Sequence, residues 1–330
     1  MKLCTFWIDA GFGGYERLGL ILPSGNVLDL NTAYALLLLE RDDHPRPYEM
    51  AEVLVPPDMV EFLRNREFGL EAASDVVESF GDGLDDPTLE GPNGEPVVYT
   101  AADLNLLAPL PRPNSIRQAM AFVEHARAIR SDQSTVPDYW FETPVYYKGN
   151  CDAVIGPDAE FPMPTYAEIL DYSLCIAAVV GQDVGELSAA EGWDVIAGYT
   201  IFNDFIARDI SVKEQACGMG PSKSTDMEGS NVLGPCLVTA DEWDPRDGHA
   251  MIGRVNGEEW SRGSTRDMHH DFGSILAHVS RSETVRAGDV IGSGAVGSGW
   301  ELGRQLKEGD VVELEVEGLG QLRTTVVSRD

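Results

Sequence analysis

The sequence predicts an α+β fold with two domains, a small α/β domain over residues 1–107 and a larger strand-rich domain over 108–330. Residues 1–107 mix short strand patterns with helix-like runs. Beyond about residue 115, short apolar runs are separated by glycines and by Asn-Gly, Gly-Asp and Asp-Gly pairs, which is typical of hairpins in a mainly antiparallel sheet. A chain of 330 residues with 43% hydrophobic content can also bury one large core or two ordinary ones.

The first domain is expected to contain strands followed by two helical segments. Residues 17–30 have the pattern of short strands, and residues 31–43 and 56–80 have the pattern of helices. The acidic, Gly- and Pro-rich segment 81–96 is a loop by composition. Three prolines between residues 109 and 113 mark a rigid boundary, and we place the domain junction there.

In the second domain, residues 169–181 predict a strand that begins half polar, ends wholly apolar and is closed by a glycine. Side chains alternate along a strand, so Asp171, Ser173 and Cys175 fall on one side of it. That side faces either solvent at a sheet edge or the interior of a polar pocket. Helices are fewer in this domain and are expected over residues 121–130, 188–198 and 271–282.

The chain carries a net charge of −31, from 55 acidic against 24 basic residues, and only five of the basic residues are lysines. Such a composition is typical of proteins that stay soluble in a high-salt cytoplasm, where ions screen the repulsion between like charges. It argues against nucleic acid as a partner, because binding to phosphates needs a stripe of basic side chains that the sequence lacks.

The sequence also argues against a membrane partner. No window approaches the roughly 18 apolar residues of a membrane span, and the first residues lack the apolar core and cleavage site of a signal peptide. We therefore expect a cytoplasmic protein. The five cysteines are odd in number, far apart and without a Cys-x-x-Cys pair, which argues against structural disulfides and a zinc knuckle.

Single residues give only weak candidates for chemistry. His125, inside a helix-like run, is either a structural histidine or a base. Asp204 and Asp209 flank Arg208 just after an apolar strand. This group could form an ion-pair network, part of a cation site, or the start of a helix capped by Asn203 or Asp204.

Eight sequence blocks, taken in order, carry a resemblance. They are AFVEHARAIR, PVYYKGN, LDYSLCIAAVVG, IAGYTIFNDFIARDI, GPSKSTD, VNGEEWSRGSTRDM, VRAGDVIGSGAVGSGWELG and LKEGDVVELEVEGLGQLRTTV. Together they resemble the fumarylacetoacetate hydrolase family over residues 115–330. Residues 1–107 resemble the smaller N-terminal domain that some members carry.

The resemblance implies a mixed β-roll catalytic domain that is usually dimeric, so a homodimer is expected. It also implies a hydrolase or lyase with a small oxo acid as its ligand. The family acts on 2-oxo or β-diketo acids by C–C bond hydrolysis, or by related decarboxylation, dehydration or isomerisation. In the family a Mg²⁺ or Ca²⁺ ion holds the oxygens of the keto acid and stabilises enolate charge. A histidine oriented by a glutamate activates water or moves a proton.

Part of this machinery is present in the chain. By resemblance, His125 is the base and Glu301 is the residue that orients it. Asp204 is the metal ligand in the motif Asn-Asp-x-x-Ala-Arg-Asp, which Arg208 and Asp209 complete. The resemblance assigns substrate contacts to Tyr147, Lys148, Arg208 and Lys223.

The other ligand positions differ from the family. Where the family has carboxylates that bind the metal, this chain has Gln118, Ser173 and Cys175, so only Asp204 remains of that set. Asp171 lies two residues from Ser173, about 6.6 Å along a strand, which is too far to replace the missing ligand without rearrangement. Hard cations are held chiefly by charged oxygens. Weak or absent binding of Mg²⁺ or Ca²⁺ is therefore predicted.

Two interpretations of function remain open. In the first, the chain is an enzyme for a small oxo acid with a reduced or metal-free site. In the second, it is a divergent paralogue without catalytic activity that binds a small molecule or serves as a partner subunit. The retained His125, Asp204 and Glu301 favour the first. Five departures argue against the ancestral reaction: the non-carboxylate residues Gln118, Ser173 and Cys175, and Thr225 and Ala295, which stand where the family has a lysine and a substrate-binding threonine.

Overall fold

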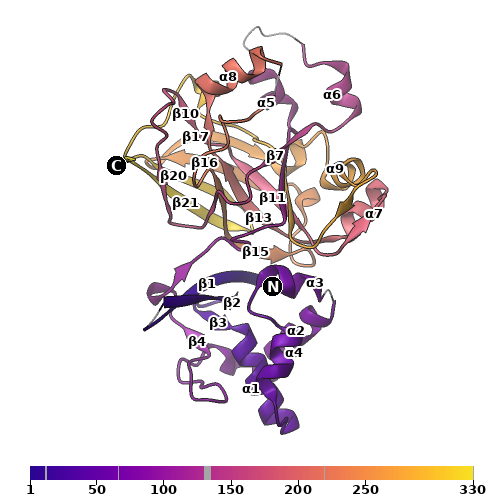
Figure 1. Ribbon diagram of the computed structural model, residues 1–330, viewed down its shortest axis with the longest axis vertical. Coiled ribbons are helices and arrows are strands. Elements are labelled where there is room, and N and C mark those ends of the chain that lie inside the picture. The colour runs from indigo at the N-terminus through magenta and orange to yellow at the C-terminus, as the bar shows by residue number, and fades with distance from the viewer. Residues whose placement is uncertain (12, 66, 130–134, 219, 330) are drawn as a thin grey trace.

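The computed structural model describes residues 1–11, 13–65, 67–129, 135–218 and 220–329. Its main feature is a 12-stranded sheet that runs through both halves of the chain (Figure 1). The strands follow the order β4 (Val98–Tyr99), β3 (Val27–Asp29), β2 (Gly13–Ile21), β1 (Lys2–Ala10), β15 (Asn231–Thr239), β13 (Ile196–Asp204), β11 (Cys175–Val180), β19 (Asp289–Gly292), β6 (Ser115–Ala119) and β7 (Tyr146–Gly149). Two further strands, β5 (Asn105–Leu106) and β8 (Val154–Ile155), pair with β1 and β15.

A 5-stranded sheet forms a second layer of the C-terminal part. Its order is β17 (Glu258–Ser264), β16 (Ala250–Val255), β20 (Val311–Val316), β21 (Gly320–Val327) and β9 (Glu160–Pro162). Two short pairs join β10 (Leu170–Asp171) with β14 (Ile206–Ala207) and β12 (Val184–Gly185) with β18 (Thr284–Val285).

Most neighbouring strands are antiparallel, and the parallel pairs are β8 with β15, β6 with β19 and β9 with β21. The hairpin between β16 and β17 turns at Asn256 and Gly257, which have φ angles of 52° and 79°. Positive φ at both central residues is what the Asn-Gly pair predicts for a tight hairpin turn. The mixed α+β architecture with mainly antiparallel sheets is therefore confirmed.

The N-terminal part shares its sheet with the rest of the chain. Strand β1 pairs antiparallel with β15, where Leu3 lies opposite Leu237. The hydroxyl of Thr5 donates to the backbone oxygen of Pro109 at 2.8 Å. Figure 1 shows the first strands and helices together in the lower half of the molecule. The expected boundary near residue 107 falls directly after β5, where the chain leaves β1, and the division into two domains stays a prediction.

The helices lie mostly where the sequence predicts them. They are α1 (Leu30–Asp42), α2 (Pro47–Leu54), α3 (Met59–Arg64), α4 (Glu67–Phe80), α5 (Val123–Ala128), α6 (Asp138–Glu142), α7 (Ala189–Asp194), α8 (Arg208–Ala216) and α9 (Phe272–Val279). Helix α1 begins after Asp29, whose carboxylate accepts a hydrogen bond from the amide of Thr32 at 3.0 Å. The single helix expected over 56–80 is wrong, because the segment forms two helices, α3 and α4. Arg130, at the end of the predicted helix 121–130, lies outside the described residues.

The continuous strand expected over 169–181 is also wrong, because β10 ends at Asp171 and β11 begins at Cys175. Between them the backbone bonds to other segments: Ser173 N donates to Asn203 Oδ1 at 3.0 Å, and Leu174 N donates to Gly297 O at 3.2 Å. Ser173 therefore lines a pocket, while Cys175 is fully buried in a hydrophobic core.

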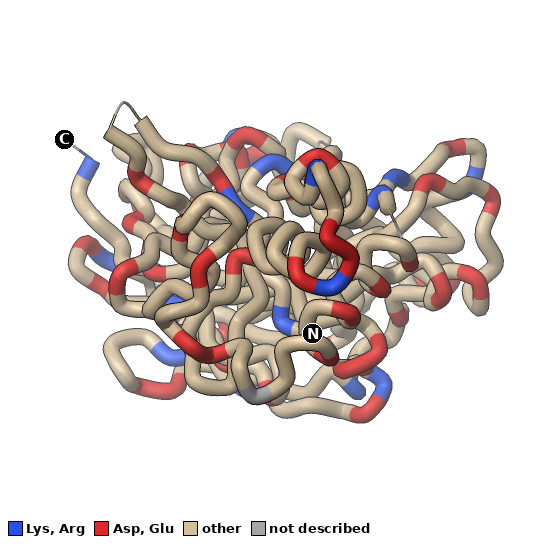
Figure 2. The backbone as a smooth tube through the Cα atoms, turned by 90° about the horizontal axis from the view of Figure 1, so that it is seen from below, with Lys and Arg blue, Asp and Glu red and all other residues tan. Residues whose placement is uncertain are grey.

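A helix start at Asn203 or Asp204, one alternative from the sequence, does not occur. Both residues lie in β13, which pairs with β11 and β15, and helix α8 starts only at Arg208. Among the described residues no helix combines the length and the apolar character that crossing a membrane requires. In the view of Figure 2 acidic residues are spread over the whole backbone, with fewer basic residues scattered among them.

Because like charges repel across this surface, we expect the thermal unfolding midpoint to rise when KCl increases from about 0.1 M to about 1 M. The screening length falls from about 10 Å to about 3 Å over this range. Differential scanning fluorimetry measures the midpoint. A midpoint that stays constant or falls would contradict adaptation of the chain to high salt.

Candidate active site

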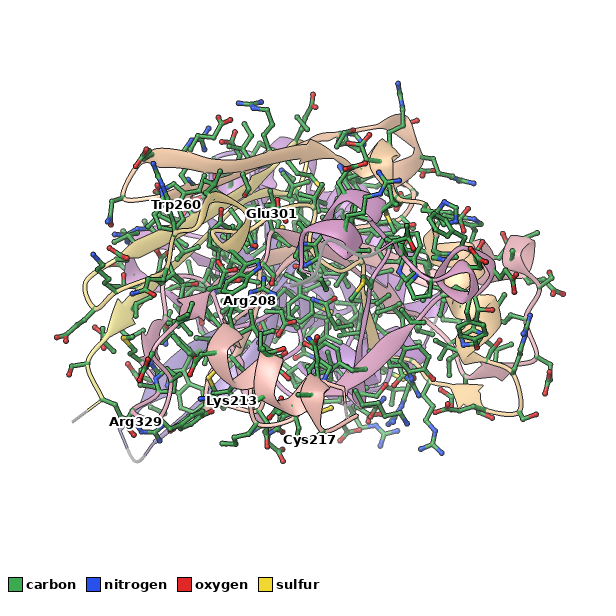
Figure 3. The ribbon with its side chains drawn as sticks, turned by 90° about the horizontal axis from the view of Figure 1, so that it is seen from above. Arg208, Lys213, Cys217, Trp260, Glu301 and Arg329 are labelled. Carbon is green, nitrogen blue, oxygen red and sulfur yellow. The ribbon has the colours of Figure 1, made fainter. Side chains whose placement is uncertain are left out.

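Helices α5 and α8 lie at one end of the molecule, and Figure 3 shows Arg208 and Glu301 there (Figures 1 and 3). Residues of both helices line a pocket of about 510 Å³. Its wall has a polar and an apolar part. The polar part includes Gln118, His125, Tyr147, Ser173, Asp204, Arg208, Ser211 and Gln215. The apolar part includes Met120, Ile129, Val145, Ile206, Pro221 and Ala295. Six of the eight sequence blocks of the resemblance thus contribute residues to one cavity.

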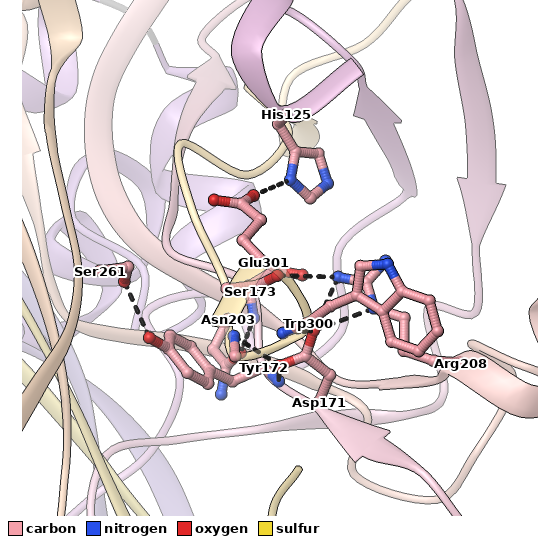
Figure 4. Close-up of polar contacts among 11 residues, drawn as sticks. His125, Asp171, Tyr172, Ser173, Asn203, Arg208, Ser261, Trp300 and Glu301 are labelled. Carbon is pink, nitrogen blue, oxygen red and sulfur yellow. Dashed lines mark hydrogen bonds and ion pairs between the residues drawn. The ribbon is translucent and has the colours of Figure 1, made fainter. Parts of the chain in front are cut away.

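His125 and Glu301 form a contact at this pocket. Helix α5 carries His125, and the 3-10 helix η5 (Trp300–Leu302) carries Glu301. The distance from His125 Nδ1 to Glu301 Oε1 is 2.8 Å, and the histidine is buried (Figure 4). A carboxylate beside Nδ1 keeps the proton on that nitrogen, so that Nε2 carries the lone pair. This is the arrangement that a general base needs.

Arg208 supplies positive charge to the same pocket. Its Nε donates to Asp171 Oδ2 at 2.9 Å, and its Nη2 donates to Ser298 Oγ at 3.3 Å. Arg208 is buried and Asp171 is fully buried. Among the described residues Arg208 Nη1 has no partner, so this side of the guanidinium is available to a ligand carboxylate.

Asp204, at the end of β13, is surrounded by hydrogen-bond donors. The Tyr147 hydroxyl donates to its Oδ2, and Gln118 Nε2 donates to the same oxygen at 3.3 Å. Oδ1 is buried and has no partner among the described residues. Burial raises the pKa of Asp204 to about 6, although the hydrogen bonds from Tyr147 and Gln118 act in the opposite direction. Burial also raises the pKa of the Tyr147 hydroxyl.

Gln118 and Cys175 lie against this carboxylate. Gln118 Oε1 accepts from Gly294 N at 3.0 Å, which turns the amide group toward Asp204 and Cys175. The distance from Gln118 Nε2 to Cys175 Sγ is 3.4 Å. Burial raises the pKa of the Cys175 thiol well above its usual value, so the sulfur is protonated at neutral pH.

The side chains around Asp204 do not fit as ligands of a hard divalent cation. Mg²⁺ and Ca²⁺ need several oxygen ligands, and most of the binding comes from charged ones. Here Asp204 Oδ2 already accepts two hydrogen bonds, Gln118 presents an amide N–H, and Cys175 presents a thiol. Within the described part of the chain, no three His, Cys, Asp or Glu side chains group in a way that could hold a metal ion.

The two lysines predicted to bind substrate lie away from the pocket. Lys148 is exposed, and its Nζ lies 3.7 Å from Glu283 Oε1. Neighbouring side chains on β7 point to opposite faces, so Tyr147 turns toward Asp204 and Lys148 away from it. Lys223 Nζ donates to the backbone oxygen of Asp226 and lies 5.7 Å from the centre of the Tyr166 ring. Neither lysine is therefore placed in the pocket lining by the structure.

Of the remaining residues that the sequence analysis singled out, one lines the pocket and two do not. Ala295 lines the pocket. Asp209 does not, because its Oδ1 accepts from Ile169 N at 3.2 Å and its Oδ2 lies 3.7 Å from Lys213 Nζ. Thr225 is buried and does not line the pocket.

Sequence reasoning missed three features of the site. It did not place Asp171 beside Arg208, it did not find Ser298 as a partner of that guanidinium, and it did not find the apolar wall of the pocket. No spacing signal connects Asp171 with Arg208, which lie 37 residues apart. For Ser298, the only signal is its place in the glycine-rich block before Glu301.

The comparisons with known proteins agree with the resemblance. The family model described as fumarylacetoacetate (FAA) hydrolase C-terminal matches residues 114–327. The chain is 28% identical to oxaloacetate tautomerase YisK of Bacillus subtilis over 327 residues, which cover 94% of this chain and 97% of YisK. It is 29% identical over 234 residues to the human mitochondrial oxaloacetate tautomerase FAHD2A, with 70% of this chain and 72% of that protein covered.

A solved structure of maleylpyruvate hydrolase from Sphingobium sp. SYK-6, in complex with manganese(II) and pyruvate, has the same fold. Its TM-score is 0.70 at 20% identity, and the likeness covers 100% of both chains. The family model covers well over half of the chain, and the relatives extend the likeness into the N-terminal part. The chain therefore belongs to the fumarylacetoacetate hydrolase family.

Proposed function

We propose that the protein is an enzyme that moves a proton on a small 2-oxo acid, in keto–enol tautomerisation or a closely related isomerisation. The contact between His125 Nδ1 and Glu301 Oε1, at 2.8 Å beside the pocket, carries this proposal. His125 Nε2 takes a proton from the carbon next to the carbonyl, and the electron pair of that C–H bond moves into the enolate. Return of the proton to oxygen gives the enol, with no net oxidation or bond cleavage between carbons.

Arg208 orients the substrate in this proposal. Arg208 lines the pocket, its Nη1 has no hydrogen-bond partner among the described residues, and this nitrogen binds the carboxylate of the 2-oxo acid by a charge-assisted hydrogen bond. The apolar wall that contains Met120 and Val145 surrounds the reacting carbon and limits access of water. A site that holds the substrate next to a base lowers the barrier mainly through orientation.

Two observations favour proton transfer over C–C hydrolysis. The two relatives described above, YisK and FAHD2A, are named oxaloacetate tautomerases. Hydrolysis of a C–C bond releases an enolate leaving group whose charge needs strong stabilisation, which a divalent metal supplies in many enzymes. The side chains around Asp204 do not fit such a metal. Proton transfer also passes through an enolate, but hydrogen bonds in the pocket can stabilise its charge, and no water has to be activated for attack on carbon. We therefore propose that this chain works without a divalent cation.

The experiment compares three outcomes with purified protein. Ultraviolet absorbance follows conversion of the enol forms of oxaloacetate and phenylpyruvate to the ketones, and proton NMR identifies the products of maleylpyruvate. Faster ketonisation without cleavage products would support the proposal. Cleavage of maleylpyruvate would identify a C–C hydrolase instead, and the absence of both activities would favour a non-catalytic paralogue.

A further inference from the structure

Asp171 accepts hydrogen bonds from several donors that belong to different parts of the site. Its Oδ1 accepts from Gly299 N at 2.8 Å and from Tyr172 N at 3.0 Å. Its Oδ2 accepts from Trp300 N at 3.2 Å and from Arg208 Nε at 2.9 Å. The residue is fully buried, and Figure 4 shows it between Arg208 and the backbone of Trp300. The Asp171 carboxylate therefore connects the guanidinium of Arg208 with the chain segment that precedes Glu301.

The segment held by Asp171 carries the partner of the base. Gly299 and Trp300 directly precede Glu301, whose carboxylate lies against His125 Nδ1. Glu301 itself is 30% exposed at its side chain, so packing alone holds it weakly. The backbone hydrogen bonds to Asp171 fix the start of η5 and hence the position from which Glu301 reaches His125.

We propose that Asp171 is a positioning residue that sets two parts of the site at once, the guanidinium of Arg208 and the Glu301–His125 pair. The inference rests on the proposed function, because it assigns Asp171 to the binding and the proton-transfer step of that reaction. It predicts that loss of the Asp171 charge affects KM through Arg208 and kcat through Glu301.

Replacing Gly299 is a second way to disturb the contact between Asp171 and the backbone that precedes Glu301. A Cβ atom at this position would lie 2.9 Å from Asp171 Oδ1 and 2.9 Å from the ring of Trp260. Its φ angle is −69°, so alanine fits the backbone there and only the steric contact changes. Gly299→Ala should therefore lift the segment from Asp171 while leaving the carboxylate and its charge in place.

A buried ion pair elsewhere in the sheet is a matched control. Asp289 is buried and accepts from Arg117 Nη1 at 3.0 Å and from Arg286 N at 3.0 Å. Neither Asp289 nor Arg117 lines the pocket. Asp289→Asn should thus cost stability as Asp171→Asn does, because each removes the charge from a buried pair, but it should leave kcat and KM unchanged.

The test is a double-mutant cycle with Asp171→Asn and Glu301→Gln, read as kcat and KM for enol ketonisation. We expect Asp171→Asn to lower kcat about 100-fold in the wild-type background, since small displacements of catalytic groups have effects of this size. In the Glu301→Gln background Asp171→Asn should lower kcat little further, because the contact between the Glu301 carboxylate and His125 is already lost. KM should rise by the same factor in both backgrounds.

Equal losses of kcat in both backgrounds, or an unchanged kcat, would overturn the inference. If Asp171→Asn does not fold, Gly299→Ala takes its place in the cycle with the same expected result for kcat. An activity-independent readout is the proton NMR signal of the hydrogen-bonded His125 Nδ1–H in histidine-labelled protein. It should disappear in Glu301→Gln and Asp171→Asn and persist in Asp289→Asn, even if the protein proves inactive on every oxo acid tested. Its persistence in Asp171→Asn would overturn the positioning role separately from the proposed function.

Discussion

His125→Gln should convert the enol form of oxaloacetate about 10²- to 10⁴-fold more slowly than the wild type, because glutamine cannot take up a proton. The effect should fall on kcat, while KM changes little, since this variant leaves Arg208, the proposed partner of the substrate carboxylate, unchanged. Stopped-flow absorbance measures both parameters. Glutamine has a similar length and keeps a polar group near Glu301, so the fold should survive.

The matched control for this variant is Lys148→Gln. Lys148 is exposed and pairs with Glu283 outside the pocket, so its replacement should leave both kinetic parameters within about twofold of the wild type. Circular dichroism and thermal unfolding would show whether both variants fold. A fully active His125→Gln protein would contradict the role of His125 as the base, whatever reaction the pocket catalyses.

The second large effect concerns the metal. The triple variant Gln118→Asp, Ser173→Glu and Cys175→Glu places three further carboxylates near Asp204, where the family has metal ligands. We expect it to bind Mn²⁺ or Mg²⁺ with micromolar affinity, whereas the wild type should show no stoichiometric binding by calorimetry. Affinity for these ions follows the number of charged oxygens. Without metal the variant should be less stable than the wild type, because the carboxylates repel each other in a buried site.

A triple variant with amides, Gln118→Asn, Ser173→Gln and Cys175→Gln, changes side chains of the same size without adding charge. It should bind no more metal than the wild type, and metal should not raise its unfolding midpoint. In the carboxylate variant, added Mn²⁺ should raise the midpoint, because an ion that binds the folded state stabilises it. Failure of a folded carboxylate variant to bind metal would show that these positions do not surround one site.

Local patterns predict much of the fold. The helix expected over residues 31–43, observed as α1, and the hairpin at the Asn256–Gly257 pair follow from short-range rules, and both occur. Residues 169–181 follow no such rule, because the contacts that break this strand come from far away in the sequence. Asp171 pairs with Arg208, and Leu174 N bonds to Gly297 O. Their partners lie 37 and more than 100 residues away, so no window of local sequence contains them.

The site is less predictable than the fold. His125 and Glu301 are 176 residues apart, and only the family resemblance connects them before the structure brings them together. Lys148 belongs to the same sequence block as Tyr147, but it does not line the pocket and its Nζ lies 3.7 Å from Glu283 Oε1. The substitutions at Gln118, Ser173 and Cys175 are visible in the sequence, whereas the hydrogen bond from the Gln118 amide to Asp204 needs coordinates.

Enol ketonisation measured with metal-free protein is the most direct test of the central claim. That claim is that His125, held by Glu301, transfers the proton without a divalent cation. Protein freed of metal with EDTA and measured with the chelator present should keep its full kcat. Added Mn²⁺ or Mg²⁺ should not increase it. Activity that disappears in EDTA and returns with Mn²⁺ would contradict the proposed mechanism.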